Sequence, residues 1–502
     1  MSIGITDEEQ KIIIDILDKY KEYLFYFYGS RVKGTYEKTS DLDILIKGKQ
    51  EMPLVILEEI KQTFDESKLP YVVNFSDYHS INKDFYKRIE KDMFPYNWKE
   101  CKIENLNIQI IDGDRGKNYP NKQELLDNGD CLFLSAQNVT KNGFNFNETQ
   151  WITKERDNLL RNGKLVYGDI VITTRGTVGN VALYSKDIKY ESIRINSGML
   201  IVRCGEGIFN EYIYYVLSSQ MFAKKIASMQ TGTAQPQLPK SHFQKMEILL
   251  PPFETQQKIA KVLSAIDDKI ELNNSINNNL EQQAQAIFKS WFVDFEPFGG
   301  TMPNDWCNGN LADIAKDIIC GKTPSTAKKE YYGNDIPFIT IPDMHNNTYI
   351  IKTERYLSAL GAESQINKLL PANSICVSCI ATAGLVSLTS MNSQTNQQIN
   401  SIIPKKEVSP YYVYMLLKSL SEKIIMLGSS GSTTCNLNKG QFAKIEIIIP
   451  SQQILDKFNE LVKFLFEQIK NLQIENQQLV QLRDTLLPKL MSGEIDVDKV
   501  EV

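Results

Sequence analysis

A long stretch of this sequence occurs twice. QLPKSHFQKMEILLPP at 237–252 is matched by NLNKGQFAKIEIIIPS at 436–451, so that Leu238 has its counterpart in Leu437, 199 positions later (437 − 238). Each copy is followed directly by a Gln- and Asn-rich stretch with a helical pattern. This spacing lies far beyond the 20–50 residues of solenoid repeats. The repeated unit is therefore a whole domain followed by a helix, and two such halves suit a target that also has two halves.

The repeat extends upstream of this segment. FLSAQNV at 133–139 matches FITIPDM at 338–344, and IVITTRGTVG matches ICVSCIATAG, both 205 positions apart (338 − 133). The change of offset from 205 to 199 indicates small insertions in loops, where such changes are tolerated. Both copies consist of short strand-like segments separated by Gly and Asn turns. We therefore predict two strand-rich domains, at 99–253 and 296–451.

The two stretches that follow these domains, 254–295 and 452–495, have the periodicity of long helices. At 1.5 Å per residue each helix is roughly 55 Å long. We expect the two helices to pair as an antiparallel coiled coil, with the polar run NNSINNN at 273–279 either fixing the register or loosening it; two unrelated surface helices are the alternative. The residues of the predicted stripes are Ile259, Leu263, Ile266, Ile270, Asn273, Asn277, Leu280, Ala284, Ile287 and Trp291 in the first helix, and Phe458, Val462, Leu465, Ile469, Leu472, Leu479 and Leu486 in the second.

Composition limits the class of protein. The 502 residues are enough for about three domains, and the apolar fraction of 42% supports ordinary cores. No apolar run reaches the length of a membrane span, and the eight cysteines are scattered, as in reduced cytoplasmic proteins. A net charge of −5 argues mildly against non-specific nucleic-acid binding, which depends on phosphate neutralisation. We expect a cytoplasmic protein whose basic residues, if it reads DNA, lie on one face.

The first 98 residues follow a different pattern. A helix at 6–22, an aromatic strand LFYFY, a second strand DLDILI, a helix at 53–68, a strand YVVNFSDY and a charged helix at 81–94 indicate a small α/β domain. The predicted fold is thus an α+β multidomain protein with segments at 1–98, 99–253, 254–295, 296–451 and 452–495.

Several long motifs together resemble a known family. IFKSWFVDFEP at 287–297 is similar to the central conserved region of the specificity subunits of Type I restriction–modification systems, and LRDTLLPKLMSGEI at 482–495 is similar to their C-terminal signature. GDIVITTRGTVGNVALY and TGTAQPQLPKSHFQKMEILLPP resemble the core of a target-recognition domain. The resemblance covers about 99–495.

The resemblance implies a division of labour between subunits. The specificity subunit is not itself catalytic and needs no cofactor, and each target-recognition domain reads one half of a bipartite double-stranded DNA target. The two helices set the spacing of the half-sites and dock two adenine-N6 DNA methyltransferase subunits, which use S-adenosylmethionine. Translocating restriction subunits, which use ATP, join this complex to cleave unmethylated DNA.

The candidate DNA-binding residues lie in two loops of the first strand-rich domain and in one loop of the second. A glycine turn lets an arginine approach DNA, glutamine pairs with adenine, and a lysine suits a phosphate contact. Plain hairpins and solvated polar loops remain the alternative for every one of these positions. The candidates are Arg175, Thr177, Thr231, Thr233, Gln235, Gln237 and Lys240 in the first domain and Ser432, Thr433, Asn436 and Lys439 in the second.

The N-terminal segment YGSRVKGTYEKTSDLDILI at 28–46 resembles the minimal nucleotidyltransferase domain of the DNA-polymerase-β superfamily. The resemblance implies a nucleoside triphosphate bound at the turn Gly29–Ser30. Asp41 and Asp43 alternate along a strand, so both carboxylates point the same way, as Mg²⁺ ligands must.

The segment departs from that family at one position. The family carries a third carboxylate on a later strand, where this sequence has Asn74, while Asp77 should face the other side of its strand. We expect a degenerate domain that keeps the fold and nucleotide binding but not the transfer activity. The alternatives are an active Mg²⁺-dependent nucleotidyltransferase that uses the strand-rich domains for targeting, and an antitoxin-like regulator.

Overall fold

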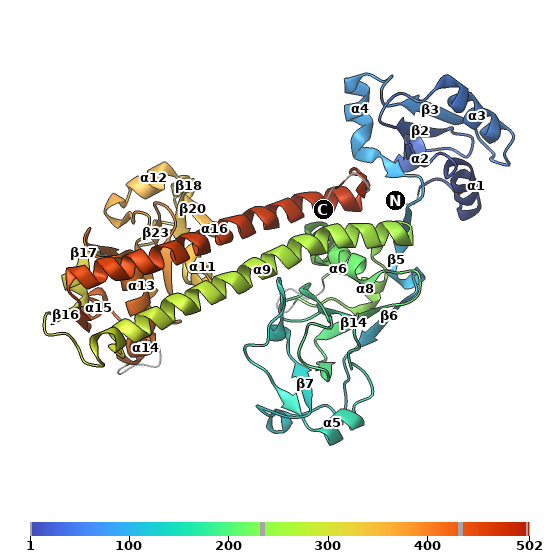
Figure 1. Ribbon diagram of the computed structural model, residues 1–502. Coiled ribbons are helices and arrows are strands. Elements are labelled where there is room, and N and C mark those ends of the chain that lie inside the picture. The colour runs from blue at the N-terminus through green and yellow to red at the C-terminus, as the bar shows by residue number, and fades with distance from the viewer. Residues whose placement is uncertain (1–2, 231–235, 430–434, 498–499, 501–502) are drawn as a thin grey trace. The chain divides into compact units, whose positions relative to one another are not determined.

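The computed structural model describes residues 3–230, 236–429, 435–497 and 500 (Figure 1). The chain forms two compact units, Met1–Ala265 with Arg483–Val502, and Ile266–Leu482. The first unit holds the N-terminal domain and the first strand-rich domain, and the second unit holds the second strand-rich domain. Each long helix contributes one part to each unit.

The N-terminal domain is a four-stranded sheet, in the order β3-β2-β1-β4, with helices packed around it. Strand β1 pairs antiparallel with β2 and β4, whereas β2 and β3 run parallel. Its apolar core joins α1 and α3 to the sheet through residues such as Ile13, Phe27, Ile44 and Ile60. The elements are α1 (Asp7–Leu17), β1 (Leu24–Tyr28), α2 (Ser30–Lys33), β2 (Leu42–Lys47), α3 (Leu54–Asp65), β3 (Val73–Asp77), α4 (Lys83–Ile89) and β4 (Phe94–Pro95).

The helix expected at 81–94 is shorter than predicted. It ends as α4 at Ile89, a 3-10 turn follows, and Phe94–Pro95 form the edge strand β4 beside β1. The residue before a proline avoids the helical region, which explains why the helix cannot extend to Phe94. The domain also contacts its neighbour, since Gln10 Nε2 donates to the carbonyl of Trp98 at 2.8 Å.

The first strand-rich domain contains two main sheets, β12-β11-β14-β6 and β10-β7-β13, and the two-stranded sheets β15-β5 and β8-β9. Helices α6 and α7 cover the first sheet with a core that includes Tyr212, Phe222 and Phe243. The elements are β5 (Lys99–Lys102), β6 (Ile108–Asp112), β7 (Cys131–Leu134), β8 (Val139–Thr140), β9 (Gly143–Phe144), β10 (Trp151–Ile152), α5 (Lys154–Leu159), β11 (Ile170–Thr173), β12 (Val181–Leu183), β13 (Ile193–Ile195), β14 (Met199–Cys204), α6 (Asn210–Ser218), α7 (Gln220–Met229), α8 (Lys240–Gln244) and β15 (Glu247–Leu250).

The second strand-rich domain repeats this topology. Its sheets run β17-β24-β21-β22-β19, β20-β18-β23 and β16-β25, so that β22, β21, β24 and β17 occupy the places of β12, β11, β14 and β6. The parallel pair β18·β23 likewise matches β7·β13. The elements are β16 (Cys307–Asn310), α10 (Leu311–Ile314), β17 (Ala315–Cys320), β18 (Tyr332–Ile339), α11 (Ile341–Met344), β19 (Tyr349–Ile350), β20 (Arg355–Leu357), α12 (Ala359–Glu363), β21 (Ile375–Ser378), β22 (Val386–Thr389), β23 (Gln394–Thr395), β24 (Ile399–Pro404), α13 (Pro410–Ser419), α14 (Ser421–Gly428), α15 (Lys439–Ala443) and β25 (Glu446–Ile449).

The two long helices are present as predicted, as α9 (Phe253–Phe292) and α16 (Gln452–Met491). They pack together in both units and run antiparallel. In the first unit, Leu263 near the start of α9 shares a core with Leu487 and Leu490 near the end of α16. In the second unit, the end of α9 meets the start of α16, where the rings of Phe288 and Phe458 lie 6.2 Å apart.

Burial along α16 differs from a simple heptad pattern. In the second unit the fully buried residues are Phe458, Val462, Phe466 and Ile469, whereas Leu465 packs only at the edge of the same core. The cause is that this part of α16 packs on the recognition domain as well as on α9, which turns a wider stripe inward.

A polar layer interrupts the seam between the helices. Asn273 is fully buried, and its Nδ2 donates to Glu475 Oε2 at 3.0 Å and to Asn476 Oδ1 at 2.9 Å. Asn476 in turn donates to Asn274 Oδ1 at 2.8 Å. These hydrogen bonds can form in only one alignment of the two helices. In the described structure the asparagine run therefore fixes the register of the helix pair.

No helix in the described part of the chain has both the length and the apolar character needed to cross a membrane.

Candidate nucleic-acid interface

Three segments meet at one edge of the first strand-rich domain. The turn that follows β11 begins at Thr174, and its backbone forms a bridge between Arg175 and Gln237, with the N–H of Leu238 donating to the carbonyl of Thr174 at 3.0 Å. The N–H of Arg175 also donates to the carbonyl of Gly198 at 3.2 Å. The turn and the polar loop that the sequence singled out are therefore adjacent in space.

The second domain builds the same edge from different residues. Ile380 bridges Asn436, and the N–H of Leu437 donates to the carbonyl of Cys379 at 2.9 Å. The backbone conformation is also shared, because Gly176 (φ 73°) and its counterpart Ala381 (φ 61°) are both left-handed. For an alanine the left-handed conformation costs about 1 kcal/mol or more in free energy. The turn shape is thus kept in both domains although the side chains differ.

The segment after β13 takes part in this edge, and we did not predict it. Asn196 Oδ1 accepts from the N–H of Gly198 at 2.8 Å, and in the second domain Asn396 Oδ1 accepts from the N–H of Gln398 at 3.1 Å. The N–H of Cys379 donates to the carbonyl of Gln398 at 2.8 Å, as the N–H of its counterpart Thr174 does to the carbonyl of Gly198 at 2.8 Å. The sequence signal for this segment was an Asn at matching positions of the two copies, Asn196 and Asn396, each two residues before the N–H that it bonds.

The side chains at this edge are available for contact. Arg175 and Thr177 are exposed, and Gln237 is half-buried. Lys240 and Lys439 each begin a short helix, α8 and α15, next to the bridged loops. Lys439 Nζ lies 3.9 Å from Asp317 Oδ1, and both side chains are about half exposed. Such an exposed ion pair contributes little to the free energy of folding. The candidates Thr231, Thr233, Gln235, Ser432 and Thr433 lie outside the described residues.

The N-terminal domain has a second polar cluster. Strands β2 and β3 are parallel, with Asp43 opposite Asn74. Asn74 Nδ2 donates to Asp41 Oδ2 at 3.2 Å and to Asp43 Oδ1 at 3.3 Å. Gly29 (φ 84°) passes so close to Asp43 that a Cβ would lie 2.3 Å from its Oδ2. The glycine turn and both carboxylates are therefore brought together.

The charges of this cluster are only partly suited to a metal ion. Burial raises the pKa of the Asp43 carboxyl, the hydrogen bond from Asn74 lowers it, and the nearby charge of Asp41 raises it, with a net upward shift. Asp77 faces elsewhere, where it accepts from the backbone N–H groups of Met52 and His79. Among the described residues no group of three His, Cys, Asp or Glu side chains could hold a metal. Two carboxylates and an amide remain, enough for one Mg²⁺ with water and phosphate ligands.

Comparison with known proteins identifies the family of the two strand-rich domains. Residues 95–282 and 303–483 match the model of the Type I restriction modification DNA specificity domain, which occurs twice, as the repeat does. The chain belongs to this family. It is 34% identical to the Type I restriction enzyme HindI specificity subunit of Haemophilus influenzae, over 80% of this chain and 100% of that one. It is 31% identical to the Type I restriction enzyme MjaIX specificity subunit of Methanocaldococcus jannaschii, over 66% of this chain and 79% of the relative.

This specificity subunit carries an extra domain. Residues 10–105 match a nucleotidyltransferase domain, and the N-terminal part is 33% identical to the "Probable protein adenylyltransferase MntA" of Haemophilus influenzae, over 20% of this chain and 90% of that protein. A solved structure of a Type I restriction–modification S subunit from M. genitalium aligns with 79% of this chain and 96% of its own length, at a TM-score of 0.47 and 18% identity.

Proposed function

We propose that this specificity subunit reads a bipartite DNA sequence, with one recognition domain for each half-site. The observation that carries the proposal is the duplicated edge, in which Arg175 and Gln237 in one domain correspond to Ile380 and Asn436 in the other. Because the backbone bridge is the same and the side chains differ, each domain presents a different set of contacts on one framework. Base edges are read by such side chains, whereas Lys240 and Lys439 suit phosphates, which carry no sequence information.

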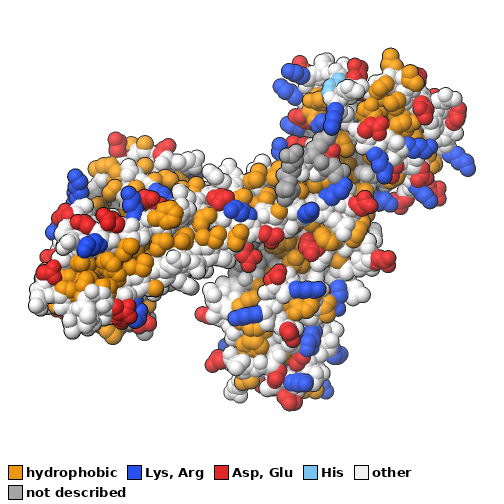
Figure 2. Space-filling model, in the orientation of Figure 1, with side chains coloured by type: hydrophobic (Ala, Val, Ile, Leu, Met, Phe, Trp, Pro, Cys, Tyr) orange, Lys and Arg blue, Asp and Glu red, His pale blue; other side chains and the backbone are white. Residues whose placement is uncertain are grey.

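The proposal includes two kinds of partner. The paired helices expose large apolar side chains, among them Phe464 (63% exposed), Leu461 and Leu272. Figure 2 shows hydrophobic side chains along α16 in the second unit. Exposed apolar faces of this kind mark protein interfaces. We assign this face to two adenine-N6 methyltransferase subunits, with translocating restriction subunits joining the same complex. S-adenosylmethionine and ATP then belong to those partners, and the subunit acts in the cytoplasm.

The N-terminal domain belongs to the proposal as a degenerate nucleotidyltransferase. Asn74, hydrogen-bonded to both Asp41 and Asp43, supports this assignment, because an amide supplies neither the negative charge nor the base of a third carboxylate. Gly29, Ser30, Asp41 and Asp43 would hold a nucleoside triphosphate with Mg²⁺. An active transferase is the second candidate, favoured by the similarity to a protein adenylyltransferase.

Co-purification tests the main proposal. The subunit is expressed with its cognate methyltransferase, the complex is isolated, and methylated adenines are mapped in the host DNA. The proposal expects one asymmetric two-part sequence with a fixed gap. Methylation that follows a single undivided sequence, or that does not change when Arg175 and Gln237 are replaced by alanine, would contradict it.

A further inference from the structure

Both recognition domains have a pocket at the same place. On one side of it lie the two helices that come after the main sheet in sequence, α6 and α7 or α13 and α14, and on the other side lies the two-stranded sheet, β15-β5 or β16-β25. In the first domain the volume is about 470 Å³, and in the second it is about 790 Å³. Equivalent bonds frame the two pockets. Lys225 Nζ donates to the carbonyl of Glu247 at 2.9 Å, and Lys423 Nζ donates to the carbonyl of Glu446 at 3.4 Å. The pockets are therefore counterparts produced by the repeat.

A protein surface covers the pocket in the first domain. The N-terminal domain supplies its outer wall from Val32, Lys33 and the segment Lys91–Phe94. Phe94 packs against the core of the recognition domain. The first pocket thus shows what this place in the fold can accept, which is an apolar side chain on a neighbouring protein surface.

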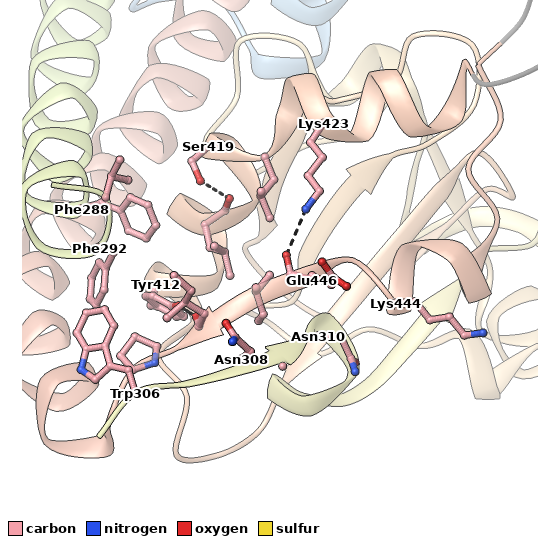
Figure 3. Close-up of a pocket in the computed structure, with 17 residues that line it drawn as sticks. Phe288, Phe292, Trp306, Asn308, Asn310, Tyr412, Ser419, Lys423, Lys444 and Glu446 are labelled. Carbon is pink, nitrogen blue, oxygen red and sulfur yellow. Dashed lines mark hydrogen bonds between the residues drawn. The ribbon is translucent and has the colours of Figure 1, made fainter. Parts of the chain in front are cut away.

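The second pocket has no such cover among the described residues of its own unit. Figure 3 shows Phe288, Phe292, Trp306 and Tyr412 together on one side and Lys423 above Glu446 on the other. Lys444 stands at the rim with its ammonium directed away from the aromatic residues. An apolar side chain can enter beside the aromatic wall, and its neighbours in sequence would then meet the rim.

Charge distinguishes the two pockets. In the first pocket the recognition domain contributes two acidic residues, Glu100 and Glu247, and one basic residue, Lys225. The wall from the N-terminal domain contributes two basic residues, Lys33 and Lys91, and one acidic residue, Asp92. In the second domain Asn308 replaces Glu100, as the pairing of each with the neighbouring strand shows. The lining charges there are Lys423 and Lys444 against Glu446. The recognition domain therefore contributes more acidic than basic residues to the first pocket and more basic than acidic residues to the second. The basic face of a second N-terminal domain fits the second pocket less well than an acidic surface does.

We propose that the pocket of the second recognition domain is a docking site for a partner protein segment that inserts an apolar side chain and carries carboxylates beside it. The lining of this pocket includes neither Asn436 nor the exposed helix residues Leu461 and Phe464. It gives this subunit a contact of its own to a further protein surface.

Two dye-labelled peptides test the chemistry by fluorescence anisotropy with the full chain. One is KDMFPYN, the sequence of residues 91–97, and the other has Glu in place of its first Lys. We expect the acidic peptide to bind about five-fold more tightly, the effect of one exposed charge pair. Lys444→Glu should reverse the preference, and Val293→Arg, at a half-exposed position in the pocket lining, should abolish binding of both.

The matched control is Lys352→Glu, an exposed lysine of the same domain outside the pocket, which should leave both affinities unchanged. The proposal is overturned if neither peptide binds, or if binding does not respond to Lys444→Glu and Val293→Arg. A preference of the unmodified chain for the Lys peptide would instead assign the pocket to a second copy of the N-terminal domain. Displacement of the peptide by DNA of unrelated sequence would assign the lysines to phosphate.

Discussion

The proposal that the N-terminal domain is degenerate rests on Asn74. Its amide lies between Asp41 and Asp43 and donates to both, where a catalytic domain would have a third carboxylate. We expect purified protein with labelled ATP and Mg²⁺ to label neither itself nor a partner, because general-base help worth ~10²–10⁴ in rate is missing. Asn74→Asp should restore labelling, and Asp41→Ala in that background should remove it. Strong labelling by the unmodified chain would show an active enzyme.

The first recognition domain contains a buried ion pair. Asp157 and Arg194 are 6% and 4% exposed, and Arg194 Nε lies 2.8 Å from Asp157 Oδ1. Asp157→Asn leaves the Arg194 guanidinium buried without its counter-charge, so we expect a loss of about 3–5 kcal/mol in the free energy of unfolding. Denaturant unfolding measures the loss, with the exposed Asp127→Asn as control. A change below about 1 kcal/mol would contradict this account.

The same pair predicts a pH dependence. Burial raises the pKa of the Asp157 carboxyl, but hydrogen bonds from Lys164 and Arg194 and their charges outweigh burial, so the net shift is downward. An aspartate whose folded pKa is lowered stabilises the fold above its unfolded pKa, about 4, and loses that contribution as the pH falls through the folded pKa. Unfolding measured between pH 5 and pH 2 should therefore show less pH dependence in Asp157→Asn; an equal slope in both proteins would refute this.

The sequence predicts some of these residues and not others. Asn74 was identified from the sequence as the residue at the place of the family's third carboxylate, whereas its register opposite Asp43 in the parallel pair is seen only in the structure. The pair of Asp157 and Arg194 does not follow, because Asp157 lies in helix α5 and Arg194 in strand β13, and no local sequence pattern links the two elements. Asn196 and Asn396 were missed for the same reason, although their positions in the repeat correspond.

At the scale of elements, the long helices were predicted well and their packing less well. Heptad leucines suggested a two-helix seam, but Phe466, outside the predicted stripe, is fully buried because the recognition domain also packs on α16. The short helix α4 and strand β4 were merged in the prediction, since seven residues of helix carry too little periodicity to mark an end. Length and periodicity predict an element, whereas its neighbours determine its buried face.

The polar layer makes the helical pair a testable spacer. Asn273 and Asn476 hold one register, so inserting seven residues after Asn277 in α9 alone should prevent assembly of an active complex or change the gap between half-sites. Matching insertions in both helices, after Asn277 and before Leu472, restore the pairing. They should lengthen the gap by about 3 base pairs, since seven residues add about 10 Å. Mapping of methylated adenines measures the gap, and an unchanged gap with full methylation would exclude the helices as the spacer.

At the scale of the whole molecule, the N-terminal domain should be dispensable for DNA modification. Trp98 is 5% exposed and belongs to the core of the first recognition domain. A shortened chain should therefore start near Pro95 rather than after Trp98. We expect this chain, with the cognate methyltransferase, to modify the same sites as the full chain. Loss of modification, with unfolding curves of the recognition domains unchanged, would mean that the N-terminal domain takes part.

The domain plan follows from the repeat, since two copies of one sequence pattern must share one topology. The order of strands in each sheet does not, because β7 pairs with β10 and β13 and not with its immediate neighbours in sequence. Pairings across 50 or more residues are fixed by the packed core and carry no local signal.

The central claim is that each recognition domain reads one half of the target. Residues 99–253 are replaced by the corresponding domain of a relative with a different target, and methylated adenines are mapped with the cognate methyltransferase. We predict that one half-site changes to that of the donor, while the other half-site and the gap are kept. A change in both half-sites, or in neither, would contradict the claim.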